Sequence, residues 1–193
     1  MTFLNRKDHD VGVAESRQRF EEIYTEHYAA VSSFVRRRAD HPEDTADVIA
    51  ETFTTAWRRL ADVPPGDEAL LWLYGTARRT LANHRRGTLR RTALALRLRE
   101  EHSAYADPAA DRAPEGARAA FARLSDDDRE LLSLVGWEGL GTAEIAKVLG
   151  CSHMAVRQRL HRARKRLAAE LAADDIDLST YGRRAVSLAK ESA

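Results

Sequence analysis

The sequence of 193 residues has little cysteine and no long apolar segment. Its one cysteine, Cys151, excludes an internal disulfide and a zinc site built from a cysteine cluster. No apolar run approaches the length of a membrane span, and the first residues have no signal-peptide core. No stretch of any length alternates between apolar and polar residues as a strand does. We therefore expect an all-α protein of the cytoplasm, without membrane insertion.

Catalytic signatures are also missing. The seven histidines are scattered, and the sequence has no HExxH motif, no glycine-rich phosphate loop and no cysteine pair. Asp126, Asp127 and Asp128 could suggest a metal site, but their place after Ser125 is typical of the first turn of a helix. We therefore expect no catalytic residues, no metal and no cofactors.

Opposite charges occupy different segments, although the formal net charge is only +1. Eight arginines and no acid occur from Arg78 to Arg99, whereas five acids lie between Asp40 and Glu51. From Ile145 to Ala169 there is again no acid. Any affinity for DNA must come from this segregation of charge, since the total charge is too small to supply it.

The segment from Thr142 to Val156 has the packing pattern of a helix-turn-helix. Ala146 is small enough for two helices to cross closely, and Gly150 can adopt the positive φ that a sharp turn needs. Val156 then anchors the second helix against the first. A basic helix presented in this way is a common device for reading the DNA major groove.

The second helix of the motif has an apolar side and a basic side. Its apolar stripe recurs at steps of four, three and four residues, at Val156, Leu160, Ala163 and Leu167. The residues off that stripe are suited to DNA, because arginine pairs with guanine edges, glutamine with adenine, and arginine and lysine with phosphate. They are Arg157, Gln158, His161, Arg162 and Lys165.

The chain is predicted to form two small helical domains joined by a flexible linker. Apolar spacing predicts helices over about 17–38, 42–60, from 67 onward, 115–123 and 125–137. Proline and glycine at 64–66 force a loop, and Phe53, Trp57 and Trp72 are expected in the core. The predicted division is a polar tail over 1–16, domains over 17–99 and 115–171, a linker over 100–114 and a tail over 172–193.

The ordered pair of domains resembles a bacterial RNA polymerase sigma factor of the extracytoplasmic-function (ECF) group. Residues 124–167, LSDDDRELLSLVGWEGLGTAEIAKVLGCSHMAVRQRLHRARKRL, resemble region 4 of that family along their whole length. The segments DVIAETFTTAWRRL at 47–60 and WLYGTARRTLANHRR at 72–86 are similar to its region 2. The resemblance covers about residues 17–99 and 115–171.

The resemblance implies a role for each block. Region 4 would contact the −35 promoter element through the basic helix face. Region 2 would hold core RNA polymerase and capture the melted −10 element. The implied polymerase contacts are the acids Asp44, Asp47 and Glu51, and the implied −10 contacts are Arg78, Arg79, Arg85 and Arg86. The partners implied are core RNA polymerase, promoter DNA and an anti-sigma factor.

The chain departs from the family pattern at three positions. Arg79 stands where the family usually has asparagine, Asn83 where it has aspartate, and Ala50 where it has glutamine. The specificity loop, which corresponds to 61–70, contains two prolines and lacks an aromatic stacking platform. These departures bear on −10 base preference and on polymerase binding.

Two other classes of protein remain open from the residues alone. A stand-alone helix-turn-helix regulator, with residues 1–100 as a sensor or dimerisation module, would bind a palindromic operator without polymerase. A nucleic-acid enzyme would need a pocket with paired carboxylates, a metal cluster or an activated nucleophile.

Overall fold

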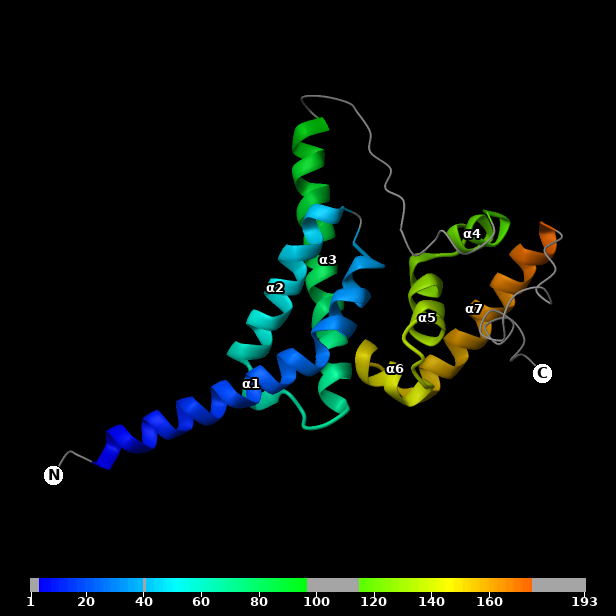
Figure 1. Cartoon of the computed structure of the whole chain (residues 1–193). Helices are drawn as coiled ribbons and strands as arrows, with labels where there is room; N and C mark the ends of the chain where they lie inside the picture. Colours follow the sequence, from blue (N-terminus) through cyan, green and yellow to red (C-terminus); the bar gives the residue numbers. More distant parts are fainter. Residues whose placement is uncertain (1–3, 40, 97–114, 175–193) are drawn as a thin grey trace. The chain divides into compact units, whose positions relative to one another are not determined.

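The computed structural model describes residues 4–39, 41–96 and 115–174, and every regular element within them is helical (Figure 1). The chain divides into two compact units, residues 1–105 and 106–193. The all-α prediction is therefore confirmed. The predicted linker over 100–114 and nearly all of the tail over 172–193 lie outside the described residues. Within the described ranges, no helix is long and apolar enough to cross a membrane.

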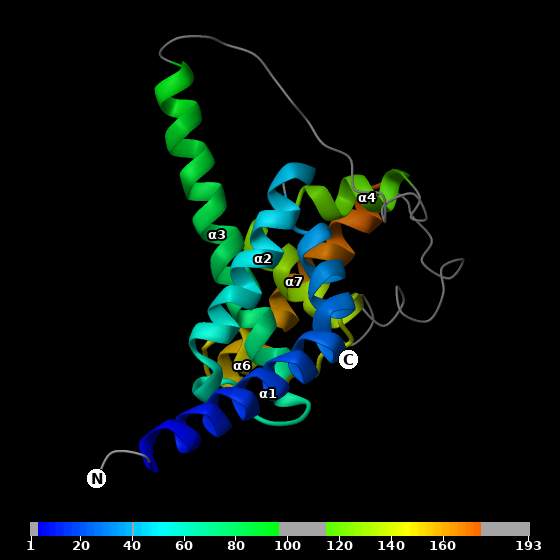
Figure 2. The same cartoon turned by 60° about the vertical axis from the view of Figure 1, so that its left-hand side comes forward.

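The first unit packs three α-helices against one another: α1 (Leu4–Arg36), α2 (Pro42–Arg58) and α3 (Glu68–Leu96). A short 3-10 helix, η1 (Leu60–Asp62), follows α2. Phe34 of α1 stacks on Tyr74 of α3 with ring centroids 4.6 Å apart, and both rings are buried. The C-terminal half of α3 extends beyond the other two helices in both views (Figures 1 and 2).

Helix α1 begins well before the predicted position. The sequence predicts a loose tail over 1–16, whereas the helix starts at Leu4. Residues 4–16 contain no proline, and extending an existing helix costs far less than nucleating a new one. The packed part of α1 therefore supports added N-terminal turns that have no apolar stripe of their own.

The boundaries of α2 follow local signals as predicted. His41 is extended, with φ −130° and ψ 136°, and Pro42 occupies the first helical turn. Glu43 and Asp44 lie in that turn, where the helix dipole favours negative charge. After η1, the loop turns at Gly66, whose φ of 62° suits glycine. The loop is tied to α1 because Arg19 donates to the carbonyl oxygen of Val63 at 2.5 Å.

The second unit is built around its longest helix. Helix α7 (His153–Ala173) packs against α4 (Glu115–Ala122), α5 (Asp126–Gly136) and α6 (Thr142–Leu149). Ser125 caps α5 by accepting a hydrogen bond from the backbone N–H of Asp128 at 3.2 Å, as the sequence predicts. The core includes Leu131, Leu132, Leu134, Ile145, Val156 and Leu160.

Candidate nucleic-acid interfaces

Helices α6 and α7 form the predicted helix-turn-helix. Gly150 ends α6 in the left-handed region with φ 64°, and the N–H of Cys151 donates to the carbonyl of Ala146 at 3.1 Å. Ser152 then starts α7 by accepting from the N–H of Ala155 at 3.2 Å. A contact of 2.6 Å between Thr142 Oγ1 and His153 Nε2 links the two helix starts. The turn therefore fixes the direction in which α7 leaves it.

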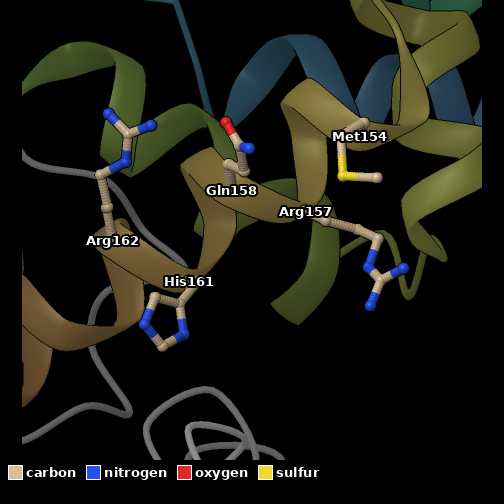
Figure 3. A pocket seen from close by; sticks show the side chains of 5 residues that line it. All are labelled: Met154, Arg157, Gln158, His161 and Arg162. Atoms are coloured by element: carbon tan, nitrogen blue, oxygen red, sulfur yellow. The ribbon is translucent and has the colours of Figure 1, made fainter.

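The two predicted sides of α7 are confirmed by burial. Val156, Leu160, Ala163 and Leu167 are buried, and Leu171 continues the stripe. The opposite side is exposed and carries all five predicted DNA contacts: Arg157, Gln158, His161, Arg162 and Lys165. Together with Met154, the first four line a shallow open hollow of about 430 Å³ (Figure 3). The helix therefore presents hydrogen-bonding groups outward from a rigid, buried stripe.

Two other arginines of α7 pair with acids of α5. Arg166 Nη1 binds both carboxylate oxygens of Asp128, at 2.9 and 2.6 Å, and Asp128 is buried. Arg159 lies 3.3 Å from Asp127. The remaining acid, Asp126, pairs with Arg129 of its own helix. These acids therefore lie at a helix start, as predicted, and they also form ion pairs that the sequence did not predict. Among the described residues there is no group of His, Cys, Asp and Glu suited to a metal.

The four predicted −10 arginines occur as two pairs on α3, seven residues apart. Arg78 is half-buried, whereas the other three are exposed. Arg79 donates to Thr76 Oγ1 at 3.0 Å, and Arg86 donates to Asn83 Oδ1 at 2.5 Å. Arg85 donates to the carbonyl of Arg38 at 2.7 Å, so it also holds the end of α1.

Arg59 joins this basic surface, and sequence reasoning missed it. Burial lowers the pKa of Arg79, and repulsion from the positive charges of Arg59 and Arg78 lowers it further. Arg59 also pairs with Asp62 at 2.8 Å, and its guanidinium lies 5.9 Å from the centre of the Trp72 ring. In the sequence, Arg59 lies just before the loop predicted between the second and third helices, and this position could have pointed to it.

The acidic side of α2 is partly engaged with α3. His84 of α3 lies between two of the predicted polymerase contacts, 3.8 Å from Asp44 and 3.2 Å from Glu51. The Asp44 side chain is only 23% exposed, so it is not part of a fully solvated face. Asp47 is exposed. The three acids therefore differ in how accessible they are to a partner.

One aromatic prediction is wrong. Phe53 is buried, but Trp57 is 45% exposed and Trp72 is only half-buried. Trp57 lies in the last turn of α2, where the ring of Phe20 meets it edge to face with centroids 5.2 Å apart. A helix end offers neighbours on fewer sides than a helix centre, so the apolar spacing overstated the burial of this ring.

Comparison with known proteins accounts for both units. Residues 23–91 match the family description "Sigma-70 region 2", and residues 115–167 match "Sigma-70, region 4". The chain is 33% identical over 140 residues to the ECF RNA polymerase sigma factor SigF of Caulobacter vibrioides, covering 70% of this chain and 75% of SigF. It is 30% identical over 174 residues to the RNA polymerase sigma factor CnrH of Cupriavidus metallidurans, covering 83% of this chain and 91% of CnrH.

A solved structure has the same fold. The sigma factor RpoE of Bartonella quintana, crystallised with the anti-sigma factor NepR, superimposes with a TM-score of 0.62 at 24% identity, covering 80% of this chain and 98% of RpoE. Sigma factors are in general non-catalytic initiation factors. The matches to both regions disfavour a stand-alone regulator. The chain thus belongs to the sigma-70 family as an ECF RNA polymerase sigma factor, which directs polymerase to promoters.

Proposed function

We propose that the exposed side of α7 reads the −35 promoter element, and that the predicted domain over 115–171 acts as region 4. One observation carries this proposal: every predicted contact is exposed on one side of a helix whose opposite side is buried. Arginine and glutamine supply paired donors and acceptors for base edges, and lysine supplies charge for phosphate. The residues assigned to the −35 element are Arg157, Gln158, His161, Arg162 and Lys165.

We assign binding of the −10 element to α3, in the predicted domain over 17–99. Its two arginine pairs would hold the phosphates of a separated strand and gain affinity from released counterions. Burial lowers the pKa of Arg79, and repulsion from Arg59 and Arg78 lowers it further. That repulsion supports the assignment, because mutually repelling cations gain from an added anion. The residues assigned are Arg78, Arg79, Arg85 and Arg86, to which the geometry adds Arg59.

We assign the contact with core polymerase to the acidic side of α2. Asp47 is exposed, and Asp44 and Glu51 flank His84. Acids on a rigid helix complement a basic partner and favour its approach. This contact would bring the two DNA-binding surfaces to the enzyme that transcribes from the promoter.

Regulation by an anti-sigma factor also belongs to the proposal. Two solved relatives support it: RpoE was crystallised with NepR, and CnrH, with a TM-score of 0.54 at 26% identity, was solved with the cytosolic domain of CnrY. We further propose that the chain has no catalytic activity of its own and works in the cytoplasm, where polymerase meets the chromosome.

Run-off transcription tests the central proposal. Core polymerase is given a promoter library with and without the full-length protein, and start sites are mapped. We expect new start sites that share −35 and −10 elements. If the protein neither co-elutes with core polymerase nor changes its start sites, the proposed function is wrong.

A further inference from the structure

Met154 is the most exposed large apolar side chain among the residues whose exposure the structure describes, at 60%. The other four exposed large apolar residues each contact a second ring. Tyr24 and Tyr28 lie against Phe53, Trp57 against Phe20, and Trp137 against Phe121. Met154 instead projects from the first turn of α7 into the hollow of Figure 3. An apolar side chain in this position gains free energy when a partner removes it from water.

The neighbours of Met154 are polar groups arranged in two rows. Gln158 and Arg162 project to one side of the α7 ribbon, and Arg157 and His161 to the other (Figure 3). Met154 precedes these residues by three, four, seven and eight positions, so it lies between the two rows at their N-terminal end. It is therefore an apolar point within a surface of hydrogen-bonding groups.

The DNA major groove has a matching pattern. Its base edges present donors and acceptors, and its one apolar group is the C5-methyl of thymine. The N-terminal residues of a recognition helix are those that contact base edges. We propose that Met154 contacts a thymine methyl in the −35 element and is a specificity-determining residue for that base pair. This inference rests on the proposed function of α7.

The proposal predicts a local base order. Arg157 and Gln158, one turn further along α7, suit guanine and adenine edges. The thymine should therefore lie within one or two base pairs of the purines that these side chains contact. The flexible thioether lets Met154 follow the methyl group without strict geometry.

The test removes single methyl groups from the DNA. The full-length protein is assembled with core polymerase, and a −35 element is selected from a randomised synthetic library. Each thymine of the element is replaced in turn by deoxyuridine, which lacks only the C5-methyl, and Kd is measured at fixed salt. At one position we expect binding to weaken about fourfold, the equivalent of one buried methylene.

The same series is measured with Met154→Ala and Met154→Leu. Met154→Ala should bind thymine and deoxyuridine promoters equally at that position, whereas Met154→Leu should keep most of the preference for thymine. Both variants should keep the melting temperature and the affinity for core polymerase of the parent protein, because the side chain is exposed. This double-mutant comparison isolates the contact between one side chain and one methyl group.

Three results would overturn the inference. The first is a deoxyuridine penalty of equal size with and without the Met154 side chain. The second is a series in which no thymine of the selected element loses affinity when deoxyuridine replaces it. The third is loss of core polymerase binding in Met154→Ala with unchanged thymine preference, which would make Met154 a protein contact. A holoenzyme without any promoter preference would instead reject the proposed function itself, and this inference with it.

Discussion

Leu160 and Arg162 are two residues apart on α7 and lie in opposite environments. Leu160 is 3% exposed, whereas Arg162 lines the open hollow. We expect Leu160→Ala to destabilise the second unit by about 2–5 kcal/mol, because a buried aliphatic side chain is lost and a cavity remains. Thermal denaturation measures this effect. Arg162→Ala is the matched control and should leave the melting temperature unchanged.

Arg162→Ala should instead change promoter choice. If the guanidinium is bidentate to a base, its loss costs about 1–3 kcal/mol and relaxes preference at one base pair. Lys165→Ala should weaken all promoters alike and reduce the salt dependence of log K by about one unit, as a lost phosphate contact does. Holoenzyme titrations on matched promoters at several salt concentrations separate the two. If Arg162→Ala unfolds the unit while Leu160→Ala only changes promoter choice, the assignment of the helix faces is wrong.

The buried and exposed positions of α7 were predictable where they depend on helical period. The apolar repeat identified the buried stripe, and the exposed side followed from it. The pairing of Arg159 and Arg166 was not predictable, because their partners come from α5 and meet them only after folding. The exposure of Met154 and Trp57 was also not predictable from the sequence. Apolar residues are expected to be buried, and the sequence does not show where a packing neighbour is missing.

Among the elements of the second unit, α5 and α7 are joined by an ion pair in which the acid is buried. The Asp128 side chain is 7% exposed and binds Arg166. The backbone N–H of Asp128 also donates a hydrogen bond to the capping hydroxyl of Ser125. We expect Asp128→Asn to lower stability by about 1.5–3 kcal/mol, the range for a hydrogen bond to a charged group. Urea denaturation gives the value.

Asp127→Asn is the control for that measurement. The Asp127 side chain is 75% exposed, and its pair with Arg159 spans 3.3 Å. Exposed pairs contribute about 0–1 kcal/mol, so this change should have little effect on stability. If the two substitutions lowered the free energy of unfolding equally, the burial of Asp128 would add nothing to the packing of α5 on α7.

Helix ends were predictable where a specific residue marks them. His41-Pro42, Ser125 and Gly150 each produce the boundary that their chemistry predicts. The start of α1 and the unbroken course of α3 to Leu96 have no such marker. In both, apolar periodicity alone does not mark where the helix begins or ends.

Across the whole molecule, opposite charges occupy different segments, although the net charge is only +1. We expect replacement of Asp44, Asp47 and Glu51 by lysine to weaken binding to core polymerase, because a basic partner would then be repelled. Far-UV circular dichroism should report an unchanged helix content. Asp47→Lys alone avoids the contacts with His84 and should account for part of the loss. Unchanged affinity in both variants would move the polymerase contact to another surface.

The acids of α5 act on the arginines of α7 as built-in counterions. Asp127 and Asp128 occupy Arg159 and Arg166, which would otherwise be available to any DNA phosphate. Such acids stay attached when DNA binds, so those arginines yield no gain from ion release. Asp127→Asn should therefore raise affinity for unrelated DNA and steepen its salt dependence, and a filter-binding series that detects neither change would contradict this. By withholding part of its own positive charge, the protein would spend less time on the rest of the genome and more at its promoters.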